Sequence, residues 1–145
     1  MLSRRALSEG EIRDRLGRKG FGEPEAHAAL GRLRELGLVD DRALSGQLTR
    51  HYRSDRRLGP RRIAAMLASR RFPRELIAEA LRGIRPEEEL SAALAALQRK
   101  FRDGILPGRE GAAKAYRFLA GRGFPPDTCR RAIRALSSEI EEGED

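Results

Sequence analysis

Apolar residues recur at intervals of three and four positions along almost the whole chain, which is the spacing of one face of an α-helix. The first such stretch follows Ser8, and Glu11 stands three positions later, a combination typical of a capped helix N-terminus. Glycine or proline separates most successive stretches. The pattern predicts eight helices, at about residues 9–17, 23–37, 41–57, 60–71, 74–82, 87–102, 109–122 and 126–140.

The composition agrees with an all-α fold. Ala, Glu, Lys, Leu and Arg supply 84 of the 145 residues, whereas Val, Ile and Thr together supply 10. The first group contains the strongest helix formers, and the β-branched residues that suit a pleated sheet are scarce. We therefore predict an all-α protein.

An internal repeat organises the helices. Phe21, Phe72 and Phe124 lie 51 and 52 positions apart, and the residues around them correspond. Five positions before, two positions before and nine positions after each phenylalanine, the corresponding sets are Leu16, Leu67 and Leu119; Lys19, Arg70 and Arg122; and Leu30, Leu81 and Ile133. Each unit consists of a leading helix followed by a helix–turn–helix pair.

Units of this kind bury their apolar faces mainly against their neighbours. The repeat therefore predicts tandem three-helix units in an elongated, curved array. We place the units at residues 1–39, 40–85 and 86–140, followed by a frayed acidic tail at 141–145. The leading helix of the first unit is shortened to a stub.

Positive charge is concentrated where the second unit leads into its helix pair. Residues 50–74 contain nine arginines and one acid, Asp55, in a chain whose net charge is +8. At helical spacing, Arg50, Arg53 and Arg57 lie opposite the apolar residues of the 41–57 helix. An exposed face with so little opposing charge favours a polyanion, or a protein that carries one, as the partner.

Catalysis has little support in the sequence. His27 and His51 are the two histidines, and neither belongs to a set of ligands at metal-binding spacing. The chain contains no phosphate-binding loop that ends in Gly-Lys-Ser/Thr. Cys129 falls on an apolar stripe, which indicates an inert core residue. Without a signal peptide or a long apolar run, we expect a cytoplasmic protein. We also expect a monomer that is not an enzyme and uses no cofactor.

Several motifs occur in a specific order. They are Leu2-Ser3-Arg4-Arg5, Gly37-Leu38-Val39-Asp40-Asp41, Gly59-Pro60-Arg61-Arg62-Ile63, and the block from Lys114 to Phe124. With these motifs the chain resembles, over nearly its whole length, the RecX family of bacterial proteins that regulate the RecA recombinase. Arg71 departs from the family pattern, in which glycine is usual at this place.

The resemblance implies three tandem three-helix repeats that form a curved, positively charged molecule. It also implies that the protein binds RecA and DNA, lies in or caps the RecA–DNA filament, and restrains recombinase and coprotease activity. We therefore expect effects on recombination, DNA repair and the SOS response. Binding to single- and double-stranded DNA alone should be weak and indifferent to sequence.

On this hypothesis, basic residues of the second and third units face the filament. The candidate DNA- and filament-binding residues are Arg50, Arg53, Arg57, Arg61, Arg62, Lys114, Arg117, Arg130, Arg131 and Arg134. Lys19, Arg70 and Arg122 each end a helix, where a cation offsets the helix dipole, so a structural role is favoured there over binding. The alternative function is a free-standing DNA-binding protein or transcription regulator with one helix in the major groove.

Overall fold

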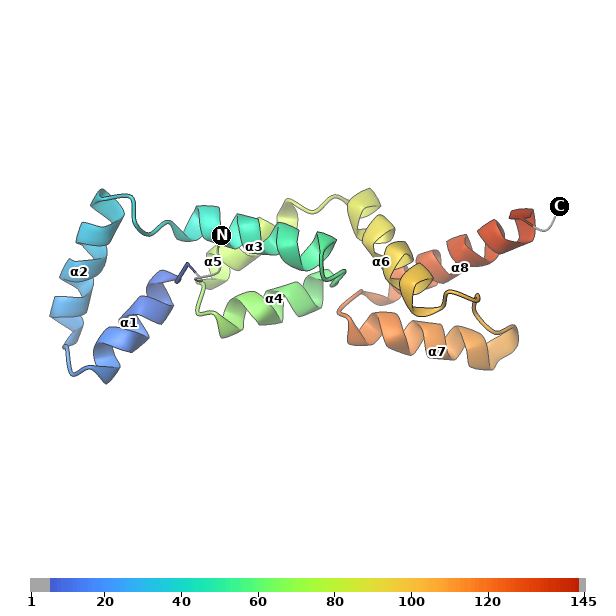
Figure 1. Cartoon of the computed structure of the whole chain (residues 1–145), viewed down its shortest axis with the longest axis horizontal. Coiled ribbons are helices and arrows are strands. Elements are labelled where there is room, and N and C mark those ends of the chain that lie inside the picture. Colours follow the sequence, from blue (N-terminus) through green and yellow to red (C-terminus); the bar gives the residue numbers. More distant parts are fainter. Residues whose placement is uncertain (1–5, 144–145) are drawn as a thin grey trace.

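The computed structural model describes the backbone of residues 6–143 and the side chains of residues 6–137. All eight predicted helices are present, and no strand occurs among the described residues, which confirms the all-α prediction. The helices are α1 (Glu9–Arg18), α2 (Glu23–Glu35), α3 (Asp41–Ser54), α4 (Pro60–Ser69), α5 (Arg74–Arg82), α6 (Pro86–Lys100), α7 (Gly108–Gly121) and α8 (Pro126–Gly143). They follow one another along an elongated molecule (Figure 1).

The first turn of a helix leaves backbone N–H groups without a helical partner. In most of these helices a side chain accepts a hydrogen bond from such a group, or a proline in the first turn removes one of them. Ser8 Oγ accepts a hydrogen bond from the Glu11 N–H at 3.1 Å, and the Glu11 carboxylate accepts one from the Ser8 N–H at 2.9 Å. These two bonds complete the predicted capping box. Asp40 caps α3 by accepting from the Ala43 N–H at 3.1 Å. Helices α4 and α6 begin with proline, whose missing N–H has no helical partner at that position.

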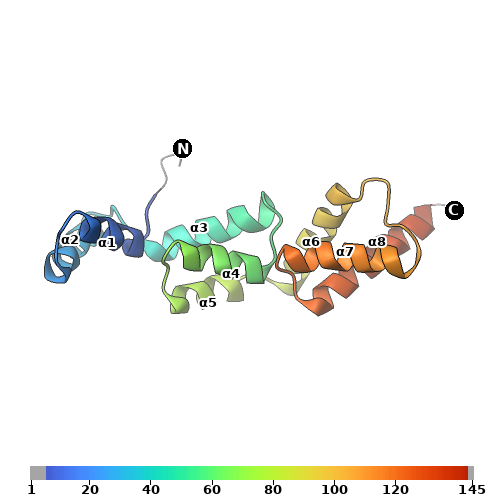
Figure 2. The same cartoon turned by 90° about the horizontal axis from the view of Figure 1, so that it is seen from below.

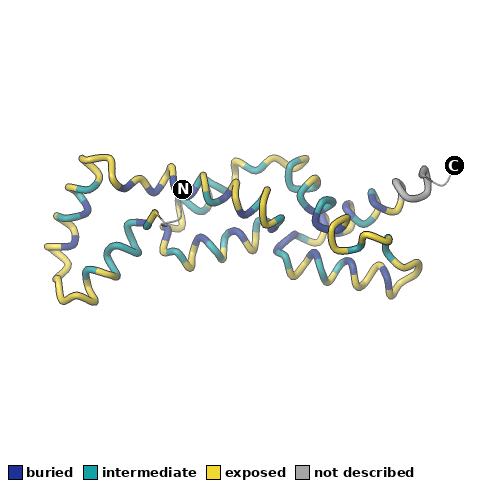
Figure 3. The backbone as a smooth tube through the Cα atoms, viewed as in Figure 1, coloured by how far each residue is buried: buried dark blue, intermediate teal, exposed yellow. Residues whose placement is uncertain are grey.

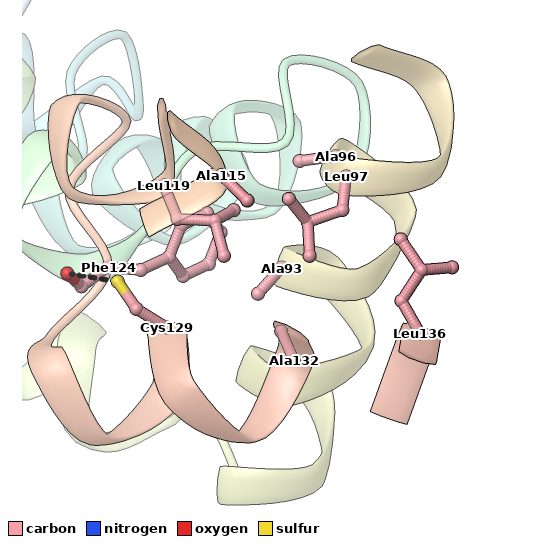
Figure 4. Close-up of a cluster of buried hydrophobic side chains, with 9 residues drawn as sticks. All are labelled: Ala93, Ala96, Leu97, Ala115, Leu119, Phe124, Cys129, Ala132 and Leu136. Atoms are coloured by element: carbon pink, nitrogen blue, oxygen red, sulfur yellow. Dashed lines mark hydrogen bonds between the residues drawn. The ribbon is translucent and has the colours of Figure 1, made fainter. Parts of the chain in front are cut away.

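The helices pack in three groups, which are α1 with α2, α3 to α5, and α6 to α8. Seen from below, α1, α4 and α7 lie in a row along the molecule (Figure 2). The second and third groups each enclose a hydrophobic core, and the core of the third group is drawn in Figure 4. Buried and exposed residues alternate along the helices (Figure 3), and the two cores contain six and nine buried residues among those described. Contacts between neighbouring groups therefore matter for the shape of the array.

The three aligned phenylalanines lie in different environments. The side chains of Phe124 and Phe72 are 1% and 5% exposed, whereas Phe21 is 48% exposed. Phe124 packs in a core that includes α6, and Phe72 packs in one that includes α3. No helix precedes α1 among the described residues, so nothing equivalent covers Phe21. Equivalent positions in the repeat thus differ in burial because their neighbouring helices differ.

Helix α3 ends at Ser54, three residues before the predicted end. The Leu58 N–H donates to the Tyr52 carbonyl oxygen at 3.0 Å, and Arg57 has a left-handed backbone with φ of 52°. This turn leads the chain away from the helix axis. The prediction that Arg57 shares one exposed helical face with Arg50 is therefore wrong.

The C-terminal end of the chain also differs from the prediction. Helix α8 continues to Gly143, so the tail predicted from residue 141 is helical over its first three residues. Residues 144–145 and the motif at residues 2–5 lie outside the described part of the chain. Over the described residues, no helix combines the length and the apolar composition that a membrane crossing requires.

The contrast between Phe124 and Phe21 can be tested by truncation. We expect Phe124→Ala to lower the free energy of unfolding of the α6–α8 group by about 3–5 kcal/mol, because it leaves a cavity in that core. Phe21→Ala should cost less than about 1 kcal/mol, because half of that side chain already faces solvent. Urea titration followed by circular dichroism measures both losses, and equal losses would contradict the burial difference.

Candidate polyanion-binding surface

The second and third groups meet where the start of α4 touches the end of α7. The Gly59 N–H donates to the Arg122 carbonyl oxygen at 2.8 Å, and the Arg61 N–H donates to the Gly123 carbonyl oxygen at 3.0 Å. Gly123 has φ of 97°, and a Cβ atom there would lie 2.3 Å from the Arg62 backbone nitrogen. Only glycine allows this approach. The contact brings the arginine-rich segment after α3 against the end of α7.

Arg122 holds this junction with its side chain. Its Nε donates to the Arg57 carbonyl oxygen at 3.1 Å, and its Nη2 donates to the carbonyl oxygen of Arg56. Charge-assisted hydrogen bonds of this kind are stronger than neutral ones. Arg122 is therefore structural, as the sequence favours, but it links two groups rather than only offsetting the dipole of α7.

Arg70 makes an equivalent contact with the first group. Its Nη2 donates to the Ala6 carbonyl oxygen at 2.6 Å, and Ser8 Oγ donates to the carbonyl oxygen of Arg70 at 2.6 Å. Its guanidinium also forms two hydrogen bonds with the Glu11 carboxylate, at 2.8 and 3.1 Å. Lys19, the third member of this set, is exposed at the C-cap of α1, where the dipole interpretation still applies.

The two junctions differ in charge. The hydrogen bonds with Glu11 raise the pKa of Arg70. Burial lowers the pKa of Arg122, and the nearby positive charges of Arg56, Arg57 and Arg62 lower it further. The second junction therefore gathers like charges, whereas the first junction pairs a cation with an acid.

A hollow of about 370 Å³ opens beside the second junction, and we call it the junction pocket. The residues that line it are Arg57, Ala96, Arg99, Lys100, Phe118 and Arg122. Lys100 Nζ and Arg122 Cζ lie 5.9 and 5.7 Å from the centroid of the Phe118 ring, within the range of cation–π attraction. The pocket thus combines four cations with one aromatic ring.

Of these four cations, only Arg57 belongs to the predicted binding set. Arg99 and Lys100 stand in the last turn of α6, where basic residues are common, so they give no distinct signal in the sequence. The repeat does contain a signal. Glu11 and Arg62 occupy equivalent positions 51 residues apart, and this reversal of charge marks the second junction as different.

A second hollow of about 550 Å³ lies between α7 and α8, and we call it the α7–α8 groove. Arg117, Arg130 and Arg134 line it together with Tyr116 and Ile133. Three of the predicted residues are thus brought together around a partly apolar surface. Cations beside an aromatic ring suit a nucleic-acid strand, because the charges attract phosphates while the ring offers a face for a base.

The remaining predicted residues are dispersed. Arg53 is 19% exposed and pairs with Glu88 of α6 at 3.1 Å, so it links the second and third groups and does not belong to an open basic face. Arg131 lies 3.9 Å from Asp127 on its own helix. The other four are exposed, and they are Arg50, Arg61, Arg62 and Lys114.

The polar groups that could suggest catalysis have structural partners. His51 Nδ1 lies 2.8 Å from Asp55 Oδ2, one helical turn away. Cys129 is fully buried, its thiol donates to the Phe124 carbonyl oxygen at 3.5 Å, and burial raises the pKa of that thiol (Figure 4). The predicted core position of Cys129 is therefore confirmed. The described residues contain no group of three or more His, Cys, Asp or Glu side chains that could hold a metal ion.

This geometry defines an all-α array of helical groups, of two, three and three described helices, with arginines gathered at one junction and in one groove. Profiles of the first, second and third three-helix domains of RecX match residues 1–33, 40–81 and 87–133. The chain is 41% identical to the regulatory protein RecX of Thermus thermophilus over 141 residues, which cover 97% of this chain and 90% of the relative. The chain therefore belongs to the RecX family of non-enzymatic regulatory proteins, and membership implies interaction with RecA.

Two solved structures are similar in fold. A crystal structure of RecX from Lactobacillus salivarius superposes with a TM-score of 0.81 at 19% identity, covering 94% of this chain and 89% of that one. A crystal structure of regulatory protein RecX superposes with a TM-score of 0.73 at 25% identity, covering 92% of this chain and 66% of that one. The elongated all-α arrangement is thus shared with crystallised members of the family.

The close approach at the second junction gives a prediction about shape. We expect Gly123→Ala to separate the second and third groups, because its methyl group would meet the Arg62 backbone and its φ of 97° disfavours alanine. The loss of stability should be about 1–3 kcal/mol. Small-angle X-ray scattering should report a changed particle length, and limited trypsin digestion should cut faster in the 56–62 segment.

Gly121→Ala is the matched control, because a Cβ built at this helical position lies within 4 Å of no atom outside the neighbouring turns of its own helix backbone. It should leave particle length and digestion unchanged. A Gly123→Ala variant that behaves like the control would show that the glycine contact does not hold the junction.

Proposed function

We propose that the protein binds the RecA–DNA filament through the junction pocket and the α7–α8 groove, and that this binding restrains RecA. The observation that carries the proposal is that cations without a described ion-pair partner gather around two hollows, and that residues of α7 contribute to both of them. Among the residues whose side chains the structure describes, no acid lines either hollow. Membership of the RecX family supplies RecA as the partner.

The length of the array suggests how binding restrains the filament. An elongated molecule whose groups are locked by hydrogen bonds at their junctions contacts a filament over a long distance (Figure 1). If it contacts successive subunits, it resists the changes in their relative position that ATP turnover needs. Restraint then follows from binding to the filament and needs no catalytic group on this chain.

The α7–α8 groove gives a direct test. We expect reversal of Arg117, Arg130 and Arg134 to Glu to weaken restraint of RecA ATPase activity on single-stranded DNA strongly, because attraction to phosphates or carboxylates of the filament is replaced by repulsion at three positions. Each lost charge-assisted contact is worth roughly 1.5–3 kcal/mol, so the concentration needed for restraint should rise more than a hundredfold.

Reversal of Arg18, Arg74 and Arg82 to Glu is the control. These residues are exposed, lie outside both hollows and give the same change in net charge. Circular dichroism checks that both variants are folded. Equal loss of restraint in the two variants would mean that net charge matters and the groove does not.

Binding to DNA alone separates this proposal from a free-standing helix–turn–helix reader. We expect weak binding, with an affinity that falls steeply with salt as counterions are released and that is nearly equal for random and selected duplexes. Fluorescence anisotropy across a salt series measures both properties. A preference of a thousandfold or more for one duplex sequence, which is typical of specific readers, would favour the alternative.

A further inference from the structure

We propose that the junction pocket is a built site for a single phosphate group. The four cations that would hold the phosphate are Arg57, Arg99, Lys100 and Arg122. This inference deepens the proposed function and rests on it only for the source of the phosphate, which is the backbone of a nucleic-acid strand.

The charge of the pocket is not neutralised from within. Across the part of the chain whose side chains are described, none of the four cations forms an ion pair. The C-terminal ends of α6 and α7 lie at the pocket, and each carries about half a negative charge. Together they offset about one of the four positive charges, so the pocket keeps an excess of roughly three.

The internal repeat supplies a comparison within the same molecule. Arg70 and Arg122 are equivalent, and both donate to main-chain carbonyl oxygens of the preceding group. At the first junction, Glu11 accepts two hydrogen bonds from Arg70 and neutralises it. The residue equivalent to Glu11 at the second junction is Arg62, which adds positive charge near Arg122. The two junctions therefore share a backbone arrangement but differ in charge balance. The first is neutralised by Glu11, whereas the second keeps an excess of positive charge that an external anion can neutralise.

Contacts within the protein already order part of this set of cations. The Arg122 guanidinium is held by the carbonyl oxygens of residues 56 and 57, and the same guanidinium and Lys100 lie over the Phe118 ring. Arg57 follows α3 in a left-handed conformation that few residues adopt without a structural cause. Groups that are ordered in advance lose less conformational entropy on binding, so the affinity for an anion is higher.

The chemistry of the lining fits a phosphodiester better than a simple anion. Guanidinium groups form paired hydrogen bonds with two phosphate oxygens, and an ammonium adds a point charge. A hollow of about 370 Å³ exceeds the space of one phosphate group. Phe118 and Ala96 leave an apolar wall against which the adjoining sugar or base can pack.

The main test removes two cations that do not hold the junction. We expect Arg99→Gln combined with Lys100→Gln to weaken binding of a short oligothymidine about tenfold or more. The salt slope should fall by at most about 0.7, because the one phosphate held at the site loses two of its four cations. Arg82→Gln combined with Arg109→Gln is the control, since both residues are exposed and lie outside the pocket. It should stay within about twofold of the unmodified protein.

A second variant gives the second junction the acid that the first junction has. Arg62→Glu places a carboxylate where Glu11 stands at the first junction, so an ion pair with Arg122 should form. We expect a higher melting temperature and oligothymidine binding weakened about tenfold, with a smaller change in both for Arg62→Gln. Undiminished binding by a folded Arg62→Glu variant would contradict the proposal.

The two probes identify the source of the phosphate. Isothermal titration with pyrophosphate and anisotropy with oligothymidine are measured on the unmodified protein and on the Arg99→Gln, Lys100→Gln variant. Weaker binding of both probes supports the site and a strand as its ligand, whereas weaker binding of pyrophosphate alone overturns the strand as the source. Unchanged binding of both probes by a folded variant overturns the site. Restraint of RecA by the groove variants is a separate measurement, so failure of the site and failure of the proposed function are distinguishable.

Discussion

The array depends on two arginines, Arg70 and Arg122, which stand at helix C-termini and donate hydrogen bonds across the junctions between helix groups. Arg70 and Arg122 each place a charged side chain on main-chain carbonyl oxygens of the preceding group. The groups have small separate cores, so little apolar area fixes their relative positions. A few directional hydrogen bonds and the close approach at Gly123 do this instead. The positions of all the basic residues relative to one another depend on these contacts.

The two junctions share the same backbone arrangement but differ in the charge of the side chains around the arginine. At the first junction the acids on α1 balance the arginines, with Glu11 against Arg70 and Asp14 against Arg71 at 2.8 Å. At the second junction Arg62 stands in the place of that acid and adds positive charge beside Arg122. On the proposed function, the first junction has a structural role and the second junction combines a structural role with binding, a difference that requires a change of side chains and no change of fold.

Arg71 shows how one departure from the family pattern is accommodated. It has φ of 66° at the position equivalent to Gly20 and Gly123, which also have positive φ. A left-handed conformation costs a residue with a Cβ atom roughly 1–2 kcal/mol. The hydrogen bonds between Arg71 and Asp14, at 2.8 and 3.1 Å, lie across the junction and partly offset that cost. The backbone at Arg71 thus keeps the left-handed conformation for which glycine is usual, and the ion pair with Asp14 helps to stabilise it.

The sequence by itself determined the eight helices, their caps and the buried position of Cys129, because these follow from spacing and from contacts within a few residues. Only the tertiary structure decided which arginines are available. It paired Arg53 with Glu88, turned Arg57 out of α3, and brought Arg57 and the end of α6 to Arg122. Hydrophobic periodicity reports which face of a helix is buried, but not which distant residue approaches it. The contact between Arg122 and Arg57 spans 65 positions, and no local pattern encodes an approach across that separation.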